Sequence, residues 1–216
     1  MSALLRYQAA LLLRSQRWLA PFLLYVAYVG VGIRPGEPVL GALGYAVTGL
    51  VPVAAWAVRI CLNQEPPAAR AVTAAAAGRA RAHLAAILTG TAAVLFTGAG
   101  TALGVTAVSD RHGVTAPAAG AEGLLAAAVC VLTGAAVGAL TTRPLIPSRG
   151  WSLATLLLGS LLALVTAGSP VRTAVTALVT DARAPTVTLP WPALVAALVL
   201  ATGAVALACR ATAWRS

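Results

Sequence analysis

The sequence predicts an all-α, polytopic membrane protein with six transmembrane helices, an N-terminal interfacial elbow helix and a short cytosolic helix, built as one transmembrane domain over residues 1–216. Three observations lead to this fold class. Hydrophobic residues make up 60% of the 216 residues and charged residues only 9%, whereas a soluble domain carries about 25% charged residues. Apolar runs of membrane-spanning length recur along the chain, and the arginines concentrate in alternate connections. A water-soluble enzyme, a secreted disulfide scaffold and a disordered tail are therefore excluded.

Six apolar runs account for the predicted spans. They are residues 18–33, 39–62, 84–108, 123–140, 151–167 and 191–209. At roughly 20 residues for each crossing, six spans leave no room for a sizeable soluble domain. The connection at 168–190 is too polar to span and too long for a turn. We expect either short helices at the outer surface or a re-entrant piece there, and an outer lid without a transport role is an equally good interpretation.

The arginines predict the orientation of the chain, because cytosolic connections are enriched in positive charge. One side holds 11 of the 15 arginines. They are Arg6, Arg14, Arg17, Arg59, Arg70, Arg79, Arg81, Arg143, Arg149, Arg210 and Arg215. The other side holds Arg34, Arg111, Arg172 and Arg183, together with four of the five acids. Both termini are therefore predicted to be cytosolic, and this placement of the charge favours a membrane topology signal over nucleic-acid binding.

The composition also points to a source. All 15 basic residues are arginine and none is lysine, and alanine is abundant. This usage is typical of a GC-rich genome, and we expect an actinobacterial plasma membrane as the location.

Residues 2–17 are predicted to form the interfacial elbow helix. Leucines gather on one arc of a helical projection and three arginines, Arg6, Arg14 and Arg17, on another. Such a helix would place leucine among acyl chains and arginine at lipid phosphates. Gln8 and Ser15 interrupt the leucine side, so an alternative is that the segment simply extends the first span into the cytosol.

The connection from Asn63 to His83 predicts a bounded cytosolic helix. Pro67 suits the first helical turn, Glu65 lies where a helix N-terminus favours negative charge, and Gly78 follows an alanine-rich run and can end it. We expect this helix to dock a cytosolic partner through four charged residues, Glu65, Arg70, Arg79 and Arg81. The alternative is an arginine-rich anchor that only sets topology.

Small residues and one proline mark candidate packing and hinge positions inside the spans. Gly100 and Gly104, and likewise Gly134 and Gly138, have the four-residue spacing that lets membrane helices approach closely. Pro52 removes a backbone hydrogen bond from the second span and is a candidate hinge.

No catalytic or metal-binding constellation is predicted. His83 and His112 fall on opposite sides of the membrane, no GxxxxGK[ST] loop is present, and the three cysteines have the character of small apolar residues. No acidic residue falls in the middle of a predicted span, although proton- and ion-driven transporters usually need one. We therefore expect any transport energy to come from another chain.

The order of these segments resembles the membrane subunit of an ABC-2 type ABC transporter in its compact actinobacterial form. The clearest stretch runs from Gln64 to Arg70 and from Gly78 to Arg81, at the position of the family's coupling helix. The resemblance implies a homo- or heterodimer of membrane subunits, each docking a cytosolic ABC ATPase that binds ATP and Mg, with no cofactor in this chain. It also implies export along a path at the subunit interface, near the second and fifth spans.

Two other functions remain open at this point. A substrate-capture subunit of an uptake transporter has a similar length and six spans, but would not need an elbow. A non-transporting accessory or immunity membrane protein would use its arginines for topology alone.

Overall fold

The computed structural model describes residues 1–34, 36–110, 113–142, 148–183 and 187–214, and within these ranges the chain forms nine α-helices and no β-strand. The helices are α1 (Ser2–Ser15), α2 (Leu19–Gly32), α3 (Val39–Asn63), α4 (Pro67–Ala77), α5 (Arg79–Val108), α6 (Ala116–Leu140), α7 (Arg149–Val165), α8 (Pro170–Asp181) and α9 (Trp191–Trp214). The expected all-helical class is confirmed. Three of the arginines that predict orientation, Arg111, Arg143 and Arg215, lie outside the described residues.

The chain is a multi-pass membrane protein. Four helices, α3, α5, α6 and α9, are long and apolar enough to cross a membrane, and α7 with α8 meets the same criterion as one bent pair. Helix α2 is apolar but only 14 residues long, or about 21 Å, against a hydrocarbon core of about 30 Å. The described residues therefore give four to five candidate spans, and the predicted count of six is not confirmed.

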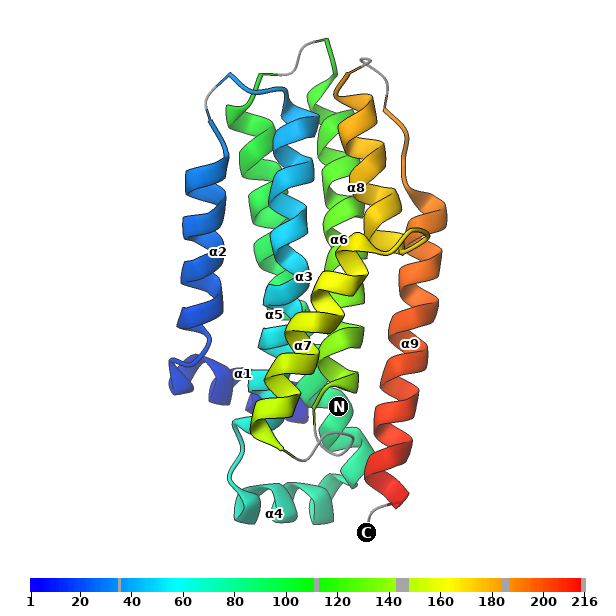
Figure 1. Cartoon of the computed structure of the whole chain (residues 1–216). Coiled ribbons are helices and arrows are strands. Elements are labelled where there is room, and N and C mark those ends of the chain that lie inside the picture. Colours follow the sequence, from blue (N-terminus) through cyan, green and yellow to red (C-terminus); the bar gives the residue numbers. More distant parts are fainter. Residues whose placement is uncertain (35, 111–112, 143–147, 184–186, 215–216) are drawn as a thin grey trace.

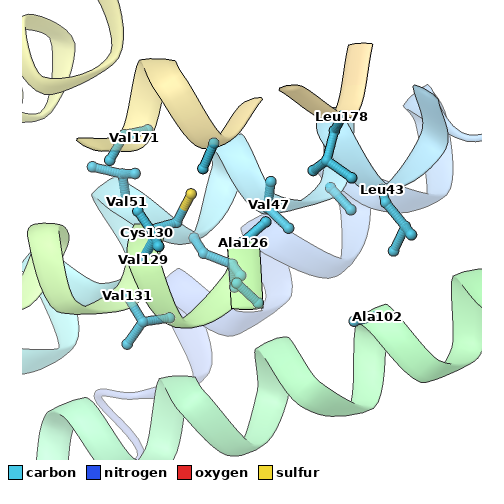
Figure 2. Close-up of a cluster of buried hydrophobic side chains, with 14 of the residues drawn as sticks. Leu43, Val47, Val51, Ala102, Ala126, Val129, Cys130, Val131, Val171 and Leu178 are labelled. Carbon is cyan, nitrogen blue, oxygen red and sulfur yellow. The ribbon is translucent and has the colours of Figure 1, made fainter. Parts of the chain in front are cut away.

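Helix α3 lies at the centre of the bundle and contacts α2, α5, α6, α7 and α8. Of its apolar stretch, 67% is buried inside the protein, where many small side chains let the neighbouring helices approach closely. The largest cluster of buried side chains joins α3 to α5, α6 and α8 (Figure 2). Leu43, Val47 and Val51 of α3 meet Ala126 and Cys130 of α6 there.

Both termini lie at one end of the bundle, and α1 and α4 lie across that same end (Figure 1). At the opposite end, the loops before α3 and after α5 are joined by backbone hydrogen bonds. The Val39 amide donates to the Asp110 carbonyl at 2.9 Å, and the Asp110 amide donates to the Glu37 carbonyl at 3.2 Å. The two ends are therefore built differently, one from crossing helices and the other from short connected loops.

Of the two forms expected for the segment at 168–190, short helices at the outer surface are not found among its described residues, whereas a re-entrant piece remains compatible with the bent helix pair. Helix α8 packs against α3, α6, α7 and α9, and Val171, Ala174 and Leu178 are fully buried. It continues from α7 across a short break with a bend of 46°, so it runs on toward the loop end of the bundle rather than lying on its surface (Figure 1).

Two side chains satisfy the backbone carbonyls at this break. Ser169 Oγ donates to the Ala163 carbonyl and Arg172 Nη1 donates to the Val165 carbonyl, each at 2.5 Å. Non-helical backbone at membrane depth requires such partners. Arg172, which was expected in an outer loop, therefore lies at the bend, partway along the bundle.

Helix α6 begins at Ala116, seven residues before the predicted fourth span. Pro117 occupies its first turn, where the missing amide proton costs no hydrogen bond. The longer helix contains Glu122, which is fully buried. Glu122 is the seventh of the 25 residues of α6, so the helix begins before the boundary predicted at residue 123, and the expectation that no acid lies in the middle of a span is not contradicted.

Candidate functional site

The end of the bundle that carries α1 and α4 contains the four residues predicted to couple to a partner. Local sequence fixes the shape of this region. Pro66 is extended at the N-cap of α4, and Pro67 follows in the first turn. Gly78 has a φ of +86°, a left-handed conformation that side chains other than glycine rarely adopt. It ends α4 and lets α5 start in a new direction.

Glu65 is the centre of the contacts between these helices. Its side chain is 6% exposed, and its Oε1 accepts hydrogen bonds from the Tyr7 hydroxyl at 3.0 Å and from Thr73 Oγ1 at 3.1 Å. Tyr7 belongs to α1 and Thr73 to α4. The carboxylate thus joins the N-terminal helix to the short helix that follows α3, and charged acceptors make the stronger hydrogen bonds.

Arg70 does not pair with the Glu65 carboxylate. Its Nη2 donates to the Glu65 backbone carbonyl at 3.0 Å and to the Leu62 carbonyl at 3.5 Å. These carbonyls lie at and just beyond the end of α3, where the last turn leaves acceptors without intrahelical partners. Arg70 is half-buried and acts as a brace between α4 and the end of α3.

A second polar contact holds α1 in place. Gln8, which is 2% exposed, accepts a hydrogen bond from Gln64 Nε2 at 2.9 Å through its side-chain oxygen and at 3.3 Å through its backbone carbonyl. One turn later, Leu12 packs against Cys61 and Ala86. Gln8 interrupts the leucine face of α1, and the hydrogen bonds from Gln64 explain why a polar residue is buried at this position.

The arginines of the predicted elbow helix lie on the exposed surface and not against the bundle. Arg6, Arg14 and Arg17 are exposed, and Arg17 lies beyond the end of α1, after Gln16 has turned the chain with a φ of +52°. The structure thus gives a separate helix over Ser2–Ser15 whose inner side packs on the bundle and whose arginines remain free to meet solvent or lipid headgroups. Its contact with a membrane surface stays a prediction.

Arg79 and Arg81 are also exposed. They lie on the first turn of α5, beyond the break at Gly78, so Arg70 and Arg81 do not share one continuous helix. Among the four predicted coupling residues, Glu65 and Arg70 hold the junction together, and Arg79 and Arg81 present charge outward. Val72, on the outer side of α4, is 68% exposed and adds an apolar contact surface.

A cavity of about 400 Å³ lies between these helices. Its polar lining comprises Gln8, Glu65, Arg70, Arg79, His83 and Thr212. His83 Nε2 is buried and has no hydrogen-bond partner in the part of the chain that the structure describes. The hollow lies between α4 and α5, which contact each other beside it.

The predicted packing glycines fall into two groups. A Cβ on Gly134 would lie 2.4 Å from the Val51 carbonyl oxygen, and one on Gly138 would lie 2.6 Å from the Ala55 carbonyl oxygen. Both glycines therefore sit where α6 and α3 approach most closely. Gly100 and Gly104, by contrast, have no described atom within 4 Å of an added Cβ.

Pro52 lies inside α3, which continues without interruption from Val39 to Asn63. Its role as a hinge stays a prediction.

Sequence reasoning missed the buried Glu122 and the neighbouring Asp181, which is 6% exposed. Pro117 was the signal that could have placed the start of α6 earlier and brought Glu122 into the helix. Within the described ranges, no group of three or more histidine, cysteine, aspartate or glutamate side chains could hold a metal ion. The three cysteines are free thiols.

No protein-family model, no curated protein and no solved structure matches the chain.

Proposed function

We propose that this chain is the membrane subunit of an ATP-driven exporter of the ABC-2 type, in the plasma membrane of an actinobacterium. It crosses the membrane six times, through α2, α3, α5, α6, the broken pair α7–α8 and α9, with both termini in the cytosol. Helix α1 is the interfacial elbow and α4 the coupling helix. Two such subunits pair and each docks a cytosolic ABC ATPase, which binds ATP and Mg.

The observation that carries this proposal is the buried attachment of α1 to α4 through Glu65. A segment that only sets topology needs exposed positive charge. It does not need a buried carboxylate that accepts hydrogen bonds from α1 and α4. Force applied to α4 would reach α1 through Tyr7 and the end of α3 through Arg70. A docked ATPase could therefore move the elbow and the central helix together.

The outer face of α8 supports a path along this helix, on the side turned away from α3. Arg172, Thr173, Thr176 and Thr180 are exposed on α8, while its opposite face is buried in the bundle. A row of polar side chains at membrane depth suits a water-filled path or a second subunit better than lipid. In the proposed topology α8 belongs to the fifth crossing, one of the two near which the family resemblance implies the path.

The proposal is tested by purifying the full-length chain together with an ABC ATPase encoded beside it. Arg79→Glu combined with Arg81→Glu reverses exposed charge without touching the Glu65 contacts, and Arg183→Glu at the opposite end is the matched control. We expect the double variant to lower the amount of co-purified ATPase by about tenfold or more, and the control to retain it.

Several outcomes would contradict the proposal. If the double variant recovers as much ATPase as the wild type, Arg79 and Arg81 do not form the docking surface. A stable complex with a different membrane subunit and no direct contact between this chain and an ATPase would favour substrate capture for uptake. A chain that engages no ATPase, with no ATPase gene beside its own, would favour the accessory function.

A further inference from the structure

The end of the bundle opposite the termini holds two acidic side chains that the proposed ATPase coupling does not use. Glu122 on α6 is 0% exposed, and both of its carboxylate oxygens are buried without a hydrogen-bond partner among the described residues. Asp181 is the last residue of α8 and is 6% exposed. The helices that carry the two residues pack directly against each other.

The buried residues next to Glu122 along α6 are apolar. Ala119 and Ala126, about one turn away, are fully buried, and α6 packs against α8 and α9. Apart from Tyr45, which stacks on Tyr28, the ionisable side chains of α3, α5 and α9 lie toward the other end of the bundle, at Arg59, Cys61, Arg79, Arg81, His83, Cys209 and Arg210. The described loops at this end add Arg34, Glu37, Asp110 and Arg183, of which Arg34, Asp110 and Arg183 are exposed.

The two acids differ in their hydrogen bonding. Asp181 Oδ2 accepts from the Thr188 amide at 2.8 Å and from Thr188 Oγ1 at 2.5 Å, and both bonds stabilise a charged carboxylate. Glu122 has no such donors. An ionised carboxylate in an apolar site without partners is strongly unfavourable, and a second negative charge nearby makes it more so.

We propose that Glu122 and Asp181 form a proton-binding site, in which one proton resides on the Glu122 carboxyl group and the Thr188 donors hold Asp181. The bound proton keeps the contact between α6 and α8 free of a second charge, and its release would place two like charges between these helices. The site lies at the opposite end from the junction of α1 and α4, so it stands independently of the proposed coupling to an ATPase.

A metal cation is the competing ligand. A metal site needs several oxygen ligands around the ion, and within the described ranges no group of three candidate side chains is present. A proton needs only the one carboxylate oxygen to which it binds.

Infrared difference spectroscopy of the full-length chain in lipid nanodiscs, titrated with pH, tests the proposal. The wild type should show the C=O band of a protonated carboxylic acid, shifted in heavy water. Glu122→Gln, which keeps the size and removes the charge, should abolish this band. Glu37→Gln, a matched change at the same end, should leave it in place.

Two further measurements test whether Asp181 takes part in the site and whether the ligand is a proton and not sodium. In Asp181→Asn the repulsion is removed, so the band should disappear at a lower pH than in the wild type. Replacing sodium by choline at constant pH should leave the band unchanged. Absence of the band in the wild type, its persistence in Glu122→Gln, an unshifted titration in Asp181→Asn, or its displacement by sodium would each overturn the proposal.

Discussion

The Tyr7 hydroxyl donates a hydrogen bond of 3.0 Å to the Glu65 carboxylate, across 58 residues of sequence. This bond joins the first helix to the connection between α3 and α4. Thr73 Oγ1 donates to the same oxygen at 3.1 Å. The Glu65 carboxylate therefore links α1 directly to α4, and removing Tyr7, Glu65 or Thr73 should loosen that link before it affects the bundle.

Tyr7→Phe should loosen α1 without unfolding the protein. The lost hydrogen bond is worth about 1 kcal/mol, at the low end for a charged acceptor because Tyr7 is half-exposed. Opening of α1 should therefore become roughly fivefold more frequent. The rate of tryptic cleavage after Arg14 and Arg17 in the purified chain measures how often α1 opens.

Tyr45→Phe is the control for this experiment. The Tyr45 hydroxyl lies away from α1 and makes a longer bond of 3.4 Å to the Tyr28 carbonyl. Its loss should leave cleavage after Arg14 unchanged. If Tyr7→Phe also leaves the cleavage rate unchanged, the bond to Glu65 does not hold α1 in place.

High pH should detach α1 in the same way. Burial, and then the hydrogen bond to Glu65 and its negative charge, raise the pKa of Tyr7 above the ordinary value of 10.0. Because the folded protein holds this proton more tightly than the unfolded chain, the stabilisation is complete below pH 10 and is lost as the pH rises through the folded-state value. Cleavage after Arg14 should accelerate in that range.

Tyr7→Phe isolates this pH effect from the other tyrosines of the chain. The variant has no proton to lose at this position, so its cleavage should rise less with pH than that of the wild type. An equal rise in both proteins would assign the effect to another group.

The helix at Pro67–Ala77 was readable from sequence because its signals are local. Two prolines start it, alanine propagates it and Gly78 ends it, each through backbone geometry that needs no distant partner. The role of Glu65 was not readable in the same way. Its partner Tyr7 comes from another helix, and nothing in the residues next to Glu65 indicates that contact.

The location of α8 could not be predicted from its sequence. Its threonines and Arg172 give it the composition of a surface connection, yet Val171, Ala174 and Leu178 lie on one face and are buried. The sequence pattern indicated an amphipathic helix, but only the packing of α3 and α6 decides that its apolar face turns into the bundle. Glu122 was missed for a related reason, because its helix extends beyond the apolar run that marks the span.

Gly134→Ala should destabilise the contact between α3 and α6. The added methyl group would lie 2.4 Å from the Val51 carbonyl oxygen, and backbone atoms cannot give way as a flexible side chain can. We expect a cost of about 1–3 kcal/mol, measured as a lower midpoint of thermal unfolding in detergent.

Gly100→Ala is the matched control for Gly134→Ala. No described atom lies within 4 Å of the added methyl group, and alanine favours a helix over glycine by up to about 1 kcal/mol. The midpoint should stay the same or rise. Equal destabilisation by the two changes would mean that the loss comes from helix geometry and not from the approach of α6 to α3.

Labelling of a cysteine placed on α4 decides the orientation on which the coupling proposal depends. Ala75 is exposed on α4, and Arg183 is exposed at the other end of the bundle. In intact cells, a membrane-impermeant maleimide should label Arg183→Cys and spare Ala75→Cys, and permeabilised cells should show labelling of both. Cys61 and Cys130 are buried, and a Cys209→Ala background removes the remaining partly accessible thiol. Labelling of Ala75→Cys in intact cells would put α4 outside the cytosol, beyond the reach of any cytosolic ATPase.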